Sequence, residues 1–204
     1  MRSAEQDATG SRPDRDSLAR RTREFLDQRF ARGADGGYLP HQPVHGLEGP
    51  GEPGQLLRLA RSYRLISWIA ALQPESLIDL GAAEGYIANL ARLKCGCATL
   101  CVDLSAEACR RAAEVYGQPS VPAAIHNLPL RSAVADVVVL SEVFEHLPDP
   151  LEALSEALRI ARRFLVFSTQ ELCAGRYEQF LHLALRDPEQ PHTELNHVTR
   201  ALSL

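Results

Sequence analysis

The feature that most constrains the fold is an alternation of short apolar runs with longer amphipathic stretches after Pro74. Strands that alternate with helices form βαβ units, in which the strands are parallel and helices cover both faces of the sheet. We therefore expect an α/β fold with a parallel sheet. The predicted strands span residues 77–80, 98–102, 121–125, 137–140 and 164–167, and the predicted helices span 86–94, 106–116 and 151–162.

Three residues mark the ends of these elements. Ser105 precedes the predicted helix 106–116 and suits its N-cap, while Gly117 suits the left-handed position after its last turn. Pro122 has no backbone N–H to donate, so its strand lies at an edge of the sheet or begins at the proline.

The residues before this region divide into three parts. We expect disorder in residues 1–16 and an amphipathic helix over 17–32. Residues 33–54 hold seven of the 13 glycines and four of the 13 prolines, so they form a loop longer than most loops of compact domains. Such a loop is either a lid over a binding site or a flexible connector. The segment 17–54 then precedes the main domain, which we place at 55–204.

A further helix is predicted over residues 55–72, where apolar residues recur at helical spacing, and Pro74 stops it. Its core-facing stripe is expected to comprise Leu56, Leu59, Ala60, Tyr63, Ile66 and Ala70.

Composition narrows the function classes. The 204 residues are 45% hydrophobic and 24% charged, which is typical of a soluble globular protein. A net charge of -4 argues against a nucleic-acid partner, and the lack of a long apolar run argues against a membrane span. The polar N-terminus has no apolar segment of a signal peptide, so we expect a cytoplasmic location.

Cysteine and histidine spacing does not indicate a metal site. Cys95, Cys97, Cys101 and Cys109 cluster in the sequence, but they lack the paired C-x2-C spacing of structural zinc sites. We expect them to pack as small apolar side chains in the core. The pair His41 and His45 would suit a metal only on a helix, and its segment is predicted to be a loop.

Ligands of parallel α/β sheets bind outside the carboxyl ends of the strands, where the strand order reverses. The first predicted strand runs into the sequence DLGAAEG, residues 79–85, and then into a helix. Gly81 and Gly85 allow a tight turn and a close approach of backbone to ligand. Ala83 replaces the glycine that dinucleotide binders place beside the pyrophosphate, so a ligand without phosphates is favoured.

Asp103 follows the second predicted strand, 24 positions after Asp79. A carboxylate at this place accepts two hydrogen bonds from a ribose diol. The alternative is that Asp103 only favours the start of the next helix. Together with the glycine turn, its position favours ribose binding.

Four stretches in order resemble the "type 11" group of class I S-adenosylmethionine-dependent methyltransferases, over about residues 55–170. They read SLIDLGAAEGYIANLA, CVDLSAEACRRAA, HNLPLRSAVADVVVLSEVFEHLPDP and RRFLVFSTQE. The resemblance implies a Rossmann-like sheet, here with the family's C-terminal strand hairpin missing or reduced. The residues themselves predict a helix over 172–186, and the last 14 residues resemble the family's approach to its next helix.

The resemblance also implies a set of cofactor contacts. Asp79 would lie near the amino group of the cofactor and Asp103 at its ribose. The family's usual aspartate before its L-P-F segment is Ala124 here, so adenine recognition would rely on Asn127 or on backbone groups. The residues expected to bind S-adenosylmethionine are Asp79, Gly81, Ala82, Gly85, Asp103, Leu104, Asn127, Leu128, Ser141 and Glu142.

The function implied is in-line methyl transfer to a small-molecule acceptor. His146 follows the fourth predicted strand and is either the general base or a structural residue of the turn. Tyr38, His41 and His45 are further candidates for contact with the acceptor. The alternatives are a cofactor-binding module or truncated fragment without turnover, and an NAD(P)-dependent oxidoreductase, which the absent G-x-G-x-x-G disfavours.

Overall fold

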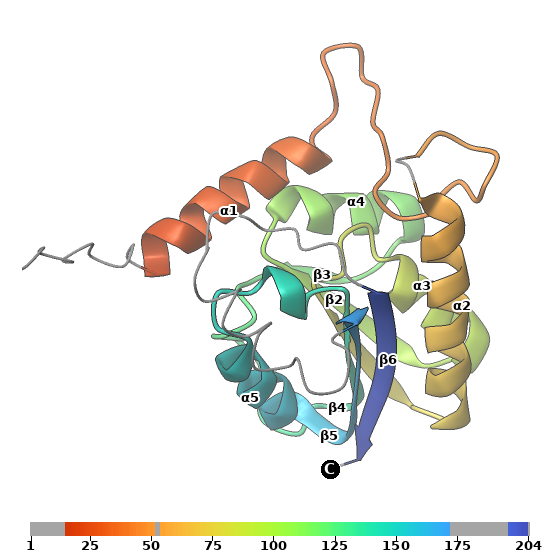
Figure 1. The fold of residues 1–204 in the computed structure, drawn as a ribbon, viewed down its shortest axis with the longest axis vertical. Helices are drawn as coiled ribbons and strands as arrows, with labels where there is room; N and C mark the ends of the chain where they lie inside the picture. The colour runs from red at the N-terminus through yellow and green to blue at the C-terminus, as the bar shows by residue number, and fades with distance from the viewer. Residues whose placement is uncertain (1–14, 52–53, 172–195, 204) are drawn as a thin grey trace, which may run out of the picture.

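A computed structural model describes residues 15–51, 54–171 and 196–203 (Figure 1). The helix expected over 172–186 lies wholly outside these ranges. Of the residues 1–16 that we expect to be disordered, 1–14 lie outside them and the last two belong to a helix. Within the described ranges, no helix combines the length and apolarity needed to cross a membrane. The elements are α1 (Arg15–Phe30), α2 (Gln55–Ala71), β1 (Ser76–Leu80), α3 (Tyr86–Cys95), β2 (Ala98–Asp103), α4 (Ala106–Tyr116), β3 (Ser120–Pro122), β4 (Ala135–Ser141), the short 3-10 helix η1 (Phe144–His146), α5 (Pro150–Ile160), β5 (Ala161–Glu171) and β6 (Asn196–Ser203).

The sheet has the strand order β3-β2-β1-β4-β5-β6, with β1 to β5 parallel. This confirms the α/β class and the parallel sheet. β3, which contains Pro122, lies at an edge, as the missing N–H of the proline requires. β6 pairs with β5 in the antiparallel direction, so a reduced antiparallel end is present. The helix approach expected in the last 14 residues is wrong for residues 196–203, which extend this sheet.

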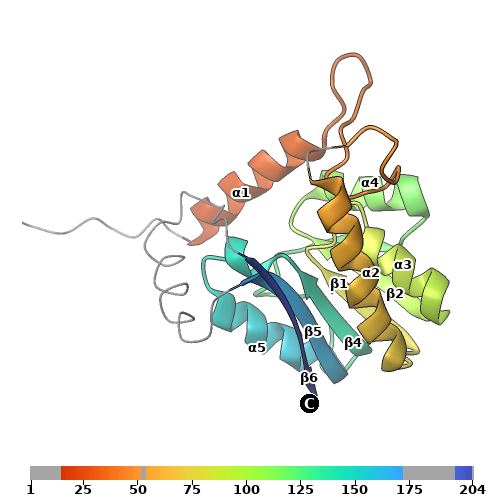
Figure 2. The ribbon, with the colours of Figure 1, turned by 45° about the vertical axis from the view of Figure 1, so that its right-hand side comes forward.

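Helices cover both faces of the sheet, with α5 on one face and α2 and α3 on the other (Figure 2). Alternate residues of β1 face the two layers: Ile78 and Leu80 pack in the α5 layer, and Leu77 packs in the α2 and α3 layer. Each fully buried aliphatic side chain contributes about 1.5–3 kcal/mol relative to exposure. Because β1 to β5 are parallel, their carboxyl ends lie along the same edge of the sheet.

The buried face of α2 differs in part from the one expected. Its buried residues are Ser62, Leu65, Ile66 and Ile69, so Ile66 of the expected stripe is confirmed, whereas Leu56 and Tyr63 are exposed. Both stripes have helical spacing, and the position of the sheet decides which one is buried. α1 packs on α4 rather than on the sheet, with Phe30 buried and Phe25 exposed.

Local signals at the helix ends act as the sequence predicts. The Ser105 hydroxyl accepts a hydrogen bond from Ala108 N at 3.1 Å, which caps α4. Gly117 has a φ of 64° and ends the same helix. The Ser105 cap places the start of α4 directly after the carboxyl end of β2, where Asp103 lies.

Candidate functional site

The candidate site lies at the carboxyl ends of β1, β2 and β4, beside the reversal of strand order between β1 and β4. The glycine turn, residues 81–85, follows β1. Gly81 N and Ala82 N donate to Val102 O of β2 at 2.7 and 3.1 Å. Gly81 has a φ of 72°, and a Cβ there would lie 2.5 Å from a methyl carbon of Val143. The turn is therefore fixed to its neighbouring strand and has no room for a side chain at Gly81.

Asp103 joins the glycine turn to α4. Its Oδ2 accepts a hydrogen bond from Ala83 N at 2.9 Å, and its Oδ1 accepts one from Ser105 N at 2.9 Å. The side chain is buried, and this burial raises its pKa to about 6. Both interpretations of Asp103 are compatible with this geometry, because a carboxylate accepts about four hydrogen bonds. Two accepted bonds hold the turn and the helix start, and a diol would use the remaining capacity.

Asp79 lies in β1, two residues before the glycine turn, and its side chain is on the α3 side of the sheet. It is 2% exposed, and its Oδ2 is buried without a hydrogen-bond partner among the described residues. Burial raises the pKa of this carboxyl to about 7, against a hydrogen bond from the backbone of Ala88. A buried acceptor without a donor is costly unless a ligand supplies one. An ammonium group is a donor that fits this carboxylate.

A further carboxyl group lies at the end of β4, on a residue with an unusual backbone conformation. Glu142 has a φ of 59°, and its N–H donates to Ser168 O at 2.8 Å. Its carboxylate forms an ion pair with Arg61 of α2 at 3.3 Å. Burial raises its pKa to about 7, and Arg61 opposes this rise. A non-glycine residue in the left-handed region marks a constrained position, which is frequent in functional sites.

The other residues of the expected site differ in exposure. Ser141 lies beside Glu142, and its Oγ is 3.1 Å from Ser168 Oγ. His146 is exposed at the end of η1. On the adenine side, Leu104 is half-buried, Leu128 is 5% exposed and Asn127 is exposed. The contacts proposed for these residues stay predictions.

Packing in the core requires a glycine at position 85, which the sequence did not indicate. Its φ is 77°, and a Cβ there would lie 2.9 Å from Ala112 Cβ and 3.2 Å from Cys101 Sγ. These atoms belong to α4 and β2, so the missing side chain faces the core between these elements. Close packing, rather than close approach to a ligand, is what the described residues require of this glycine.

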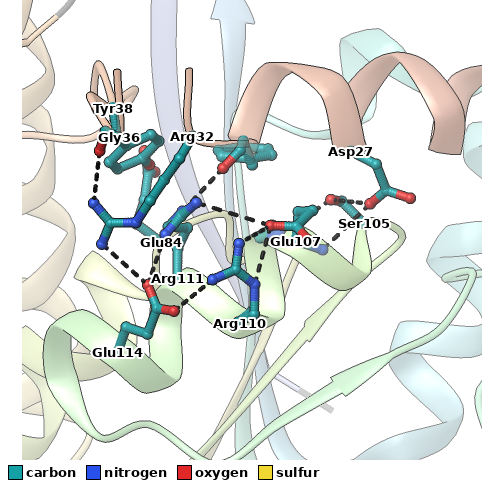
Figure 3. Close-up of polar contacts among 12 residues, drawn as sticks. Asp27, Arg32, Gly36, Tyr38, Glu84, Ser105, Glu107, Arg110, Arg111 and Glu114 are labelled. Atoms are coloured by element: carbon teal, nitrogen blue, oxygen red, sulfur yellow. Dashed lines mark hydrogen bonds and ion pairs between the residues drawn. The ribbon is translucent and has the colours of Figure 1, made fainter. Parts of the chain in front are cut away.

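Sequence reasoning missed Glu84, the acid between the two glycines. It is completely buried and lies against Tyr38, whose hydroxyl donates a hydrogen bond to it (Figure 3). It also accepts hydrogen bonds from the backbone N–H groups of residues 41 and 42. The only signal in the sequence is a charged residue inside an otherwise apolar turn. Its partners lie more than 40 positions away in the glycine-rich loop, so local sequence could not identify them.

The thiols pack as small side chains. Cys101 packs with Ala88 and Ala112 between β2, α3 and α4. Burial raises the pKa of Cys101, and it raises that of Cys109 to about 11. Across residues 15–51, 54–171 and 196–203, no three His, Cys, Asp or Glu side chains are grouped as metal ligands. Cys173 lies outside the described residues.

Residues 78–164, which contain the glycine turn, Asp103 and the end of β4, match the model of a family described as a methyltransferase domain. This segment of the chain is similar to a methyltransferase domain. Methyltransferase domains of this family bind S-adenosylmethionine. The buried acceptor of Asp79 and the turn held by Asp103 fit such a cofactor, since its ammonium and ribose groups are hydrogen-bond donors.

Solved structures show the same fold. Magnesium protoporphyrin IX methyltransferase from Synechocystis PCC 6803, with bound S-adenosylmethionine, is 18% identical with a TM-score of 0.60; the match covers 96% of this chain and 98% of that one. The cyclase SpnF is 17% identical with a TM-score of 0.59, over 83% of this chain and 71% of that one. This chain spans about half to two thirds of the length of three other matches. No curated protein matches the sequence.

Proposed function

We propose that this methyltransferase domain acts on a small-molecule acceptor by in-line methyl transfer. The proposal depends on the convergence of Asp79, Asp103 and the glycine turn at the carboxyl ends of β1 and β2. Because a cyclase shares this fold, the fold alone does not specify the reaction, and the site residues carry the argument.

The chain's own residues would bind and orient the cofactor. When bound, S-adenosylmethionine supplies a methyl group already activated by its sulfonium. Asp103 would accept hydrogen bonds from the ribose, and Asp79 would accept one from the ammonium. Leu104, Leu128 and Asn127 would border the adenine. The protein then mainly has to align the acceptor with the methyl group, and such alignment supplies much of the rate.

The acceptor would be held at the end of β4. Ser141 and Glu142 lie there, and Arg61 reaches Glu142 from α2. His146, exposed on the following 3-10 helix, is our candidate for the base that removes a proton from the acceptor. A small acceptor is favoured because the net charge of -4 gives no general attraction to a polyanion such as nucleic acid.

Binding of S-adenosylhomocysteine is expected to raise the melting temperature. A ligand that binds only the folded chain stabilises it by about 2.7 kcal/mol at a concentration 100-fold above its Kd. This corresponds to a rise of about 5–10 °C for a domain of this size. NAD is the matched control and should give no shift. A shift with NAD and none with S-adenosylhomocysteine would overturn the proposed cofactor site.

Turnover is then measured as release of S-adenosylhomocysteine from S-adenosylmethionine in the presence of a fractionated metabolite extract. If His146 is the base, His146→Ala should slow this release by roughly 100-fold, in line with general-base contributions. It should leave the thermal shift unchanged. Equal rates for the two chains would remove His146 from the proposed mechanism, and no turnover with any fraction would contradict the small-molecule acceptor.

The affinity for S-adenosylhomocysteine is expected to rise with pH. Burial raises the pKa of Asp79 to about 7 and that of Asp103 to about 6, so the folded chain favours their neutral forms. The stability linked to these groups is fully present below their unfolded pKa of about 4 and is lost as the pH rises through 6 and 7. A ligand that donates hydrogen bonds favours the ionised forms instead.

The affinity should therefore rise by up to about tenfold per pH unit between pH 6 and pH 7, more steeply below pH 6 where both carboxyl groups titrate, and level off above pH 7. Calorimetric titrations from about pH 5.5 to about pH 8 measure this change, and Asp79→Asn provides the control. That variant should weaken the pH dependence. Affinity that falls as the pH rises would show that neither carboxyl accepts a hydrogen bond from the ligand.

A further inference from the structure

Glu84 connects the glycine turn to a distant loop. We define the docked loop as residues 38–42. Three hydrogen bonds to the Glu84 carboxylate come from it: the Tyr38 hydroxyl and His41 N, at 2.6 Å, donate to Oε1, and Gln42 N donates to Oε2 at 3.3 Å. Figure 3 shows Tyr38 and Glu84 side by side above α4. A buried carboxylate is thus satisfied by donors of a loop that precedes the domain in sequence.

The docked loop also returns a hydrogen bond. Gln42 Oε1 accepts from Tyr86 N at 3.0 Å, and Tyr86 is the first residue of α3. The first N–H groups of a helix have no partner within the helix, so an outside acceptor is needed. The loop and the turn therefore exchange hydrogen bonds in both directions, and each satisfies groups of the other.

Other elements hold the docked loop in place. The guanidinium of Arg111, which is 1% exposed, lies 4.8 Å from the centre of the Tyr38 ring. Arg111 Nε also donates to Phe30 O, at the end of α1, at 2.9 Å. From α2, Gln55 Nε2 donates to Pro40 O at 3.2 Å. The loop is thus held by α2 and α4 as well as by the turn.

The geometry of the turn links this loop to the expected ribose site. Ala83 precedes Glu84, has a φ of 47°, and donates its N–H to Asp103 Oδ2 at 2.9 Å. Ala83 therefore lies between the acid that binds the loop and the acid expected to bind the ribose. If the loop left, Glu84 would lose its three donors and Tyr86 N would lose its acceptor, so fewer hydrogen bonds would hold the turn. A turn held less firmly changes the position of Ala83 more readily.

We propose that Glu84 is a positioning residue that couples docking of residues 38–42 to the glycine turn, so that a docked loop slows the dissociation of the adenosyl ligand. This inference rests on the proposed function, because it takes the turn to bind that ligand. Glu84 does not touch the ligand in this proposal; it acts through Ala83 on one side and through the docked loop on the other.

Two measurements test the coupling in the full chain. Hydrogen exchange at His41 N and Gln42 N, without ligand, reports whether the loop is docked. The dissociation rate of S-adenosylhomocysteine, from competition with excess S-adenosylmethionine, reports the coupling. Glu84→Ala should speed both by at least tenfold, and Glu84→Gln, which keeps one acceptor oxygen, should restore part of the difference. A purely local structural role would lower the melting temperature and leave the dissociation rate unchanged.

Loop-side variants keep the test valid if Glu84→Ala does not fold. Tyr38→Phe and Gln42→Ala remove a donor and an acceptor from the loop itself, and both should speed exchange and dissociation in the same direction. Tyr63→Phe, which removes a hydroxyl from an exposed tyrosine of α2, is the matched control and should change neither.

The outcomes separate the two proposals. If the unaltered chain does not bind S-adenosylhomocysteine, the proposed function fails and the coupling fails with it. If it binds, but the variants release the ligand at the unaltered rate, the proposed function stands and the coupling is wrong. Faster dissociation in step with faster loop exchange supports it.

Discussion

Asp103→Ala is expected to weaken binding of S-adenosylhomocysteine by about 30-fold to 1,000-fold. The proposed ribose contact consists of hydrogen bonds to a charged acceptor, and their loss costs about 2–4 kcal/mol. The substitution should also lower the melting temperature, because Asp103 accepts hydrogen bonds from Ala83 N and Ser105 N. Isothermal titration calorimetry below the melting temperature of the variant separates the two effects.

Ser105→Ala is the local control. It removes the cap of α4 and the contact of Ser105 Oγ with Asp27 of α1 at 2.6 Å, but it leaves the Asp103 carboxylate in place. A cap of this kind contributes about 1 kcal/mol. We expect a comparable loss of stability with affinity within a few-fold of the unaltered chain. If Asp103→Ala behaves in the same way, Asp103 has only its structural role.

Gly85→Val is expected to lower the free energy of unfolding by about 2–5 kcal/mol, the sum of left-handed backbone strain and overpacking. The residue has a φ of 77°, and its Cβ would lie 2.9 Å from Ala112 Cβ and 3.2 Å from Cys101 Sγ. The sequence alone suggested that Gly85 allows a close approach of backbone to ligand. Chemical denaturation monitored by circular dichroism measures the effect.

Gly96→Ala separates strain from packing. Gly96 has a φ of 69°, and its Cβ would meet nothing within 4 Å. This variant should lose only about 1 kcal/mol, which is the usual cost of alanine in the left-handed region. If Gly85→Val were as stable as Gly96→Ala but no longer bound S-adenosylhomocysteine, the missing Cβ of Gly85 would serve the ligand after all.

The strands could be predicted because buried parallel strands are nearly continuous apolar runs. The runs at 77–80 and 137–140 lie within β1 and β4, which the structure extends by one to two residues at their ends. The ends of α4 were also predictable, since Ser105 and Gly117 act through their own backbone and side chain. Local chemistry determines these features, so a single sequence contains them.

Features that depend on distant partners could not be predicted in this way. The buried face of α2 depends on where the sheet lies, and both of its candidate stripes have helical spacing. The extended conformation of β6 depends on its pairing with β5, because the sequence of this segment alone also resembles the approach to a helix. Glu84 is the clearest case in the site, because only the docked loop makes a buried charge acceptable in the glycine turn.

The reaction rate of two buried thiols reports how often this domain opens. Cys101 lies in β2 beneath the glycine turn, Cys109 lies on the buried face of α4, and burial raises the pKa of both thiols above the ordinary value. Only a thiolate that reaches solvent reacts with an alkylating dye. The rate at which these two positions take up such a dye, read by peptide mass spectrometry, therefore counts the openings of the layer beneath the site. No engineered label is required.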